Sequence, residues 1–131
     1  MSMQSNIAAM SCDWYAVVSA MRRQCRAFTV QSISPLCEVS ASWLDEHGVE
    51  LRWSTGRIHR NLQITLEGDA WPLDVRFSGS AWVEPPRGPQ DFKWWSAPKV
   101  QTAETTDYLE SVIAEWLPRA HREIEGLAAN C

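Results

Sequence analysis

Near the start of the chain, apolar residues recur every three or four positions, which is the spacing of one helical face. They are Ile7, Met10, Trp14, Val17, Val18, Met21 and Cys25. This stripe predicts a helix over residues 6–26, because such positions lie on one side of an α-helix. Arg22, Arg23 and Arg26 fall in its last turn, where the carbonyl end of a helix favours cations.

From Phe28 to Val83 the period changes, and apolar residues alternate with polar ones as in a half-buried strand. The clearest case is RIHRNLQITLE, residues 57–67, in which only Arg60 interrupts the apolar side. Short turns separate the segments, and no helical pattern between them is long enough for a parallel crossover. The pattern predicts a five-strand antiparallel meander over residues 28–83, with Gly79 marking a bulge or bend.

The next segment, residues 84–101, is predicted to be a loop rich in proline and tryptophan. It opens with EPPRGPQ, which holds three prolines and one glycine in seven residues and is typical of irregular structure. The following DFKWWSAPKV allows at most a short edge strand before Pro98, because proline restricts its own backbone and that of the preceding residue.

The last segment carries a second helical stripe and predicts an amphipathic helix over residues 105–128. Its apolar positions are Leu109, Val112, Ile113, Trp116, Leu117, Ala120, Ile124 and Leu127. Asp107 and Glu110 have the spacing of an N-terminal cap and its partner three residues later. Pro118 lies inside the stripe and is expected to bend the helix without ending it.

Together these elements predict a single domain, residues 1–131, of the α+β class. Each predicted strand is apolar on one side only, so both helices are expected to pack on one face of the sheet. The result is a two-layer fold whose other sheet face is polar and open to solvent. His59, Gln63, Asp74 and Arg76 are expected on that open face.

Composition narrows the classes of function. The chain of 131 residues has no run of eighteen apolar residues and no secretory signal pattern, which favours a cytoplasmic protein without membrane contact. Four cysteines without a CxxC pair indicate reduced, buried thiols. A net charge of −4 disfavours nucleic-acid binding and favours a basic partner surface.

Candidate catalytic and metal-binding residues are few. Among the three histidines, only His121, with Glu125 four positions later, has a metal-like spacing, and this pair is typical of a solvated helix face. His59 and Asp74 share the polar sheet face, as outward strand residues ordinarily do. No nucleophile motif, glycine-rich phosphate loop or HExxH motif is present. The sequence therefore predicts no catalytic residue, no metal and no cofactor.

Eight tryptophans are the unusual feature of the composition. Trp14, Trp43, Trp53 and Trp116 follow apolar periods and are expected in the core. The adjacent Trp94 and Trp95 should point to opposite faces if the segment is extended, so that one ring is exposed. An exposed ring beside cations is typical of a protein-binding hot spot. The predicted partner-binding residues are Arg87, Phe92, Lys93, Trp94 and Trp95.

These observations favour a non-enzymatic protein-binding factor over three alternatives. Small acidic inhibitors, such as phage anti-CRISPR proteins and toxin-immunity proteins, share this profile of size, charge and absent motifs; this is an analogy of profile alone. One alternative is a small hydrophobic-ligand binder, in which sheet and helix grip a cavity lined by Trp53, Trp71, Phe77 and Trp116. A second is a secretion chaperone, although such chaperones usually place a further helix between the strands.

The third alternative is an enzyme that uses His59 and Asp74 on the sheet face. A homodimer also stays open as a partner arrangement, because a polar sheet face or an edge strand can pair with its own copy.

Overall fold

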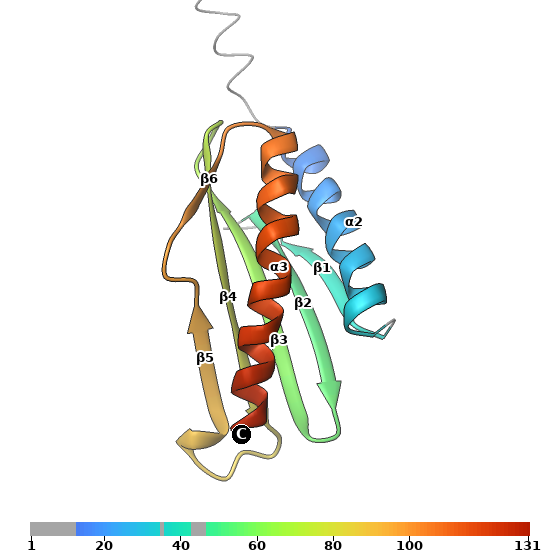
Figure 1. Cartoon of the computed structure of the whole chain (residues 1–131), viewed down its shortest axis with the longest axis vertical. Coiled ribbons are helices and arrows are strands. Elements are labelled where there is room, and N and C mark those ends of the chain that lie inside the picture. Colours follow the sequence, from blue (N-terminus) through green and yellow to red (C-terminus); the bar gives the residue numbers. More distant parts are fainter. Residues whose placement is uncertain (1–12, 35, 43–46) are drawn as a thin grey trace, which may run out of the picture.

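The structure, a computed structural model, describes residues 13–34, 36–42 and 47–131. Two helices cover one face of an antiparallel sheet (Figure 1), which confirms the predicted α+β class and two-layer arrangement. The elements are α2 (Trp14–Ser32), β1 (Glu38–Ser42), β2 (His47–Thr55), β3 (Ile58–Glu67), β4 (Leu73–Val83), the 3-10 helix η1 (Pro89–Asp91), β5 (Phe92–Ser96), β6 (Gln101–Ala103) and α3 (Thr106–Ala129).

Strands β1 to β4 form a meander in which each strand pairs with the next along the chain. The outer edge of β4 is shared by two short strands: β5 pairs with residues 78–82, and β6 pairs with residues 73–75. β5 is the short strand before Pro98 that the sequence allowed within the predicted loop over residues 84–101, whereas β6, which begins at Gln101, was not predicted. At eleven residues, β4 is long enough to accept both along one edge.

The first helix also differs from its prediction. It begins after Asp13, whose side chain accepts a hydrogen bond from the Ala16 backbone N–H, and it continues to Ser32 rather than ending at residue 26. Phe28, predicted to begin the meander, extends the buried stripe of α2 by packing edge-on against His121 of α3. The predicted residues 6–12 of this helix, like Cys12 and Trp43, lie outside the described residues.

The core fills the space between the sheet and the two helices. Gln24 of α2 donates a hydrogen bond to the Glu110 carbonyl of α3 over 2.8 Å, which joins the helices to each other. The largest side chains that are almost fully buried are Met21, Leu51, Leu62, Ile64, Leu73, Phe77, Leu109, Ile113, Leu117 and Ile124. They come from β2, β3, β4 and both helices, so all the long elements contribute to one continuous core.

Gly79 does not mark the bulge predicted for it, since the register of β4 with β3 is uninterrupted from Asp74 to Val83. A Cβ at this position would overlap Ile124 Cδ1 of α3 and the Asn61 carbonyl oxygen of β3. The glycine is therefore explained by the close approach of α3 to the strand, which leaves no room for a side chain.

α3 begins one residue later than predicted and is capped by a different residue. Thr105 is the N-cap, because its hydroxyl accepts a hydrogen bond from the Tyr108 backbone N–H over 3.1 Å. Asp107 lies in the first turn, where the helix dipole favours a carboxylate. The helix then continues through Pro118 to Ala129, as a single helix.

Candidate functional site

The side of the sheet that faces away from the helices carries an aromatic surface. In β5, Phe92 and Trp94 lie opposite Trp82 and Ser80 of β4, while Trp95 lies opposite Gly79. Because successive strand residues point to opposite faces, the adjacent tryptophans separate. The Trp94 side chain is 68% exposed on the open face, and Trp95 packs against the core on the helix side. This confirms the prediction that one ring of the pair is exposed.

Four rings from three strands form a continuous line, here called the aromatic row: His59 of β3, Trp82 of β4, and Phe92 and Trp94 of β5. The centroids of His59 and Trp82 are 5.6 Å apart, those of Trp82 and Phe92 are 5.7 Å apart, and both pairs are stacked. Phe92 and Trp94 meet edge to face at 4.8 Å. Each ring supports its neighbour, so the row presents a firm surface rather than separate mobile side chains.

His59 is held at the end of the row by two polar neighbours. Its Nδ1 lies 2.7 Å from the Ser54 hydroxyl, and its Nε2 lies 3.2 Å from a Glu84 carboxylate oxygen. A neutral ring satisfies both contacts when Ser54 donates to Nδ1 and Nε2–H donates to Glu84. The histidine is thereby fixed in orientation, which suits it to packing against Trp82.

The catalytic alternative paired His59 with Asp74, and the structure keeps these residues apart. His59 lies opposite Trp82 in the β3–β4 ladder, whereas Asp74 lies opposite Glu67 at the far end. Eight positions along a strand correspond to roughly 26 Å. The two side chains therefore cannot exchange a proton directly.

Beside the aromatic row lies a polar network centred on Glu50 of β2. The Glu50 carboxylate accepts hydrogen bonds from Asn61 over 2.9 Å and from Gln63 over 3.2 Å, and it pairs with Arg52 at 2.7 Å. Asn61 in turn accepts a bond of 2.6 Å from the Ser80 hydroxyl, which connects β2, β3 and β4. Three strands are thus fixed to one another across the open face.

At the other end of the open face is a hollow of about 290 Å³. Gln63 and Arg76 line it, together with Lys99 from the connection between β5 and β6. Arg76 pairs with Glu67, so its charge is partly neutralised. The open face therefore joins an aromatic half to a polar half.

The charge of this face is net negative. Its strand residues include two arginines, Arg52 and Arg76, each of which pairs with a glutamate. By strand alternation and register, the carboxylates on the face are Glu38, Glu50, Glu67 and Asp74. Two carboxylates therefore remain beyond those that the arginines neutralise.

The predicted partner-binding set is divided by the structure. Phe92 and Trp94 come together in the aromatic row, while Lys93 and Trp95 point to the helix side of the sheet. Arg87 lies in the loop before η1, where its backbone N–H donates to Asp91 over 2.7 Å. The predicted sheet-face residues all belong to the open face, with His59 at one end and Asp74 at the other.

Trp82 and the polar network were missed from the sequence. The signal for Trp82 lay in the alternation of β4. Even-numbered residues of this strand, such as Asp74 and Arg76, face outward, and Trp82 is even-numbered. The buried residues Leu73, Val75 and Phe77 are odd-numbered. A bulge at Gly79 would shift the alternation by one residue, so the expected bulge left the face of Trp82 undetermined. Without the bulge, the alternation alone places Trp82 on the open face.

His121 is half-buried, so the prediction of a solvated face was wrong for the histidine, whereas the Glu125 side chain is 39% exposed. The imidazole lies between Phe28 and Trp53, with centroids 5.8 Å and 5.6 Å away. Burial lowers the pKa of His121, the carboxylate of Glu125 opposes this shift, and Arg60 adds to it. The ring therefore favours its neutral form within the fold.

Glu125 also explains the arginine that interrupts the apolar side of β3. Arg60 is 8% exposed, and its Nε lies 2.6 Å from a Glu125 oxygen that also accepts the Trp53 indole N–H over 2.9 Å. This pair, buried on its arginine side only, ties α3 to β2 and β3, so the positive charge of Arg60 is compensated at the boundary of the core.

The thiols of Cys25 and Cys37 are free and buried, as predicted, whereas the free thiol of Cys131 is only half-buried. Burial raises the pKa of Cys25 to about 12 and that of Cys37 to about 11. Both are therefore protonated at neutral pH, and a protonated thiol is a poor nucleophile. They act as small apolar residues between α2 and the start of β1.

Within residues 13–34, 36–42 and 47–131, no three His, Cys, Asp or Glu side chains lie close enough together to hold a metal ion. Neither of the two helices described combines the length and the apolar character needed to cross a membrane. Comparison of the chain with known proteins found no matching family model, no matching curated protein and no matching solved structure.

Proposed function

We propose that this protein is a non-enzymatic binding factor that docks onto another protein through the open face of its sheet and inhibits that protein or its complex. The observation that carries the proposal is the aromatic row, in which Trp94 is 68% exposed and Phe92 43% exposed on a surface fixed by stacking. Tryptophan that is rigidly presented at a surface is typical of binding hot spots.

Charge supports a protein partner over nucleic acid. Aromatic rings on a sheet can stack on unpaired bases, but such sites also supply cations that track the phosphates. Here Glu84 lies against His59 at one end of the row, and Glu50 lies in the adjoining polar network. We therefore expect a partner whose contact surface is basic, with an arginine or lysine placed over Trp94 or Phe92.

The inhibitor class rests on an analogy of size and charge with anti-CRISPR and toxin-immunity proteins. A rigid face whose strands are fixed to one another by stacked rings and polar side chains is suited to covering a partner's surface. The separation of His59 from Asp74 and the protonated thiols of Cys25 and Cys37 give no support to a catalytic role.

The test compares wild type with the Phe92→Ala, Trp94→Ala double variant in affinity capture from lysate of the source organism. Tyr108→Ala is the matched control, because Tyr108 is 56% exposed on α3, away from the open face. We expect one protein to be retained by wild type and by the control and lost by the double variant. Circular dichroism of all three proteins checks that they are folded.

The retained protein is then purified, and its affinity and activity are measured with each variant. Loss of a hot-spot tryptophan should weaken binding by about 2 kcal/mol or more, and wild type should reduce the partner's activity in proportion to the complex formed. Capture that is equal for the double variant and wild type would exclude the aromatic row as the docking surface. Unchanged partner activity in a saturated complex would exclude inhibition.

The alternative of a small hydrophobic ligand rests on the rings between sheet and helices. Phe77 is 2% exposed and stacks on Trp116 with centroids 6.0 Å apart, so these two rings fill space with each other. An apolar molecule that copurifies with the protein and is identified by mass spectrometry would favour this function. The secretion-chaperone alternative would instead require the captured protein to be bound in a partly unfolded form.

A further inference from the structure

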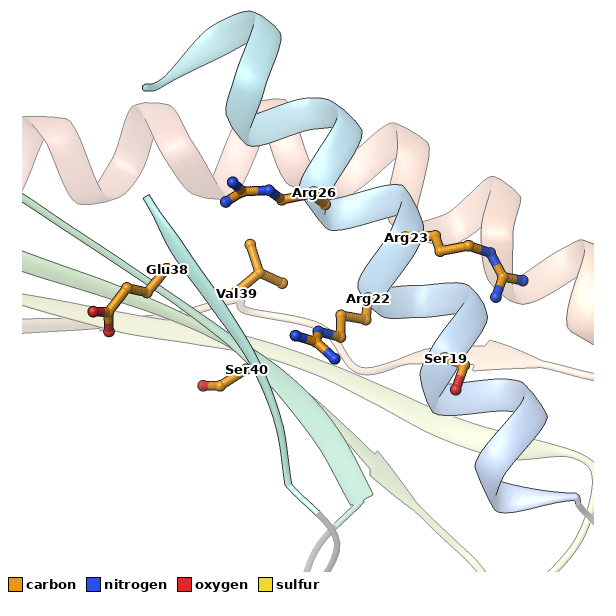
Figure 2. A pocket seen from close by; sticks show the side chains of 7 residues that line it. All are labelled: Ser19, Arg22, Arg23, Arg26, Glu38, Val39 and Ser40. Atoms are coloured by element: carbon orange, nitrogen blue, oxygen red, sulfur yellow. The ribbon is translucent and has the colours of Figure 1, made fainter. Parts of the chain in front are cut away.

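A groove of about 770 Å³ runs between α2 and the edge strand β1, at the edge of the sheet opposite to β5 (Figure 2). Its helix wall consists of Ser19, Arg22, Arg23 and Arg26, and its strand wall of Glu38, Val39 and Ser40. In Figure 2, Arg22 and Arg26 extend from α2 towards β1, whereas Arg23 points away from the strand. The groove therefore places two guanidinium groups along one edge of the sheet.

This groove is basic within an acidic chain. Three arginines line it against one glutamate, although the chain as a whole has a net charge of −4. Among the described residues, Arg22 and Arg23 have no carboxylate partner, in contrast to Arg52, Arg60, Arg76 and Arg119. Arg26 donates to the Cys37 carbonyl over 2.6 Å and thus lies directly beside the start of β1. A negatively charged ligand would complement this wall.

The strand wall adds a second recognition element. β1 is the end of the sheet, and in the part of the chain that the structure describes it pairs with β2 alone. Its other edge offers backbone N–H and C=O groups to a further strand. An extended peptide that pairs there would lie alongside the arginines of α2.

The spacing of the arginines fits a strand. Arg22 and Arg26 are four residues apart on α2, which corresponds to a rise of about 6 Å. Alternate residues on one side of a strand are about 6.8 Å apart. Carboxylates at alternate positions of an added strand would therefore lie next to both guanidinium groups at once.

We propose that the groove between α2 and β1 binds an acidic, extended peptide segment of a partner protein, which adds a strand to β1 and directs alternate carboxylates to Arg22 and Arg26. This site lies on a different surface from the aromatic row and does not depend on the function proposed for that row.

The probe is a fluorescein-labelled octapeptide of alternating glutamate and threonine, whose binding is followed by fluorescence anisotropy. An octapeptide with lysine in place of glutamate tests the charge. Two further acidic octapeptides test the strand pairing: one is N-methylated at the odd-numbered amides and the other at the even-numbered amides. N-methylation removes the backbone N–H donors and leaves the charges unchanged. We expect the acidic peptide to bind, the lysine peptide not to bind, and at least one N-methylated form to lose at least tenfold in affinity.

Protein variants locate the site. Arg22→Gln should weaken binding about threefold to fivefold, as expected for one exposed ion pair, and Arg22→Gln with Arg26→Gln should weaken it further. The matched control is Arg122→Gln, which removes an exposed arginine from α3. Trp94→Ala should leave the affinity unchanged, so the result is separable from the test of the aromatic row.

Three results would overturn the proposal. The first is no binding of the acidic peptide to wild type at low salt. The second is equal affinity of both N-methylated forms and the parent peptide, which would indicate attraction between charges without an added strand. The third is displacement of the peptide by inorganic phosphate at equal concentration, which would indicate a general anion site.

Discussion

The two faces of the sheet use the same residue types for different purposes. On the helix side, Phe77 and Trp95 are covered by α3 and contribute to the core. On the open side, Phe92 and Trp94 are supported only by neighbouring rings and remain exposed. Strand alternation sets the face to which a ring points, and the presence or absence of the helix layer on that face then decides whether the ring stabilises the fold or is available for binding.

The largest difference between the faces is expected for phenylalanine. Phe77→Ala should lower the free energy of unfolding by about 3 to 5 kcal/mol, because it removes a buried ring and leaves a cavity beneath Trp116. Phe92→Ala on the open face should cost about 1 to 2 kcal/mol, because it removes two aromatic contacts, with Trp82 and with Trp94, but leaves no buried cavity. Urea denaturation of both variants measures the difference. Equal costs would show that the open face is also packed in solution.

The adjacent tryptophans give a sharper and smaller contrast. Trp95→Ala should lower the free energy of unfolding by about 2 kcal/mol, since Trp95 is only partly buried. Trp94→Ala should change it by about 0.5 kcal/mol or less. Acrylamide quenching of the two single variants provides an independent measurement, because the variant that keeps Trp94 should retain the more accessible emission.

The smallest expected effect is the dependence of stability on pH, which arises from His121 on the helix side of the sheet. Burial lowers the pKa of His121 from its ordinary value of 6.5, so the unfolded chain takes up a proton more readily than the folded one. Its contribution to stability is complete above pH 6.5 and is lost as the pH falls towards the lower folded pKa. Urea denaturation between about pH 7.5 and pH 5 should give a shallower decline for His121→Phe than for wild type. Parallel curves would contradict this assignment.

Sequence patterns were sufficient for the elements that bury one regular stripe. The apolar alternation of β3 and the helical stripe of α3 each predicted an element to within a residue or two. In both segments the apolar repeat continues over many residues and lies on one face only. No other secondary structure would bury the same residues equally well.

The errors arose where a contact distant in the sequence decides the local structure. Gly79 was interpreted as a bulge because the approach of Ile124 cannot be seen in the sequence. The short strand β6 exists because β4 has a free edge beside it. The aromatic row depends on the register of three strands, which local periodicity does not fix. Trp94, Phe92 and His59 could therefore be identified as separate candidates, whereas Trp82, which joins them into one row, could not.

The order of elements along the chain has a consequence during synthesis. α3 covers β3, β4, β5 and β6, yet it follows all of them in the sequence (Figure 1). While the ribosome is still completing this helix, the apolar side of β3 and β4 has been synthesised without its cover, whereas α2 is already present to cover β1 and β2. Such surface is prone to aggregate or to recruit chaperones until it is buried. During synthesis, therefore, the face of the sheet that later forms the core is more prone to non-specific association than the open face.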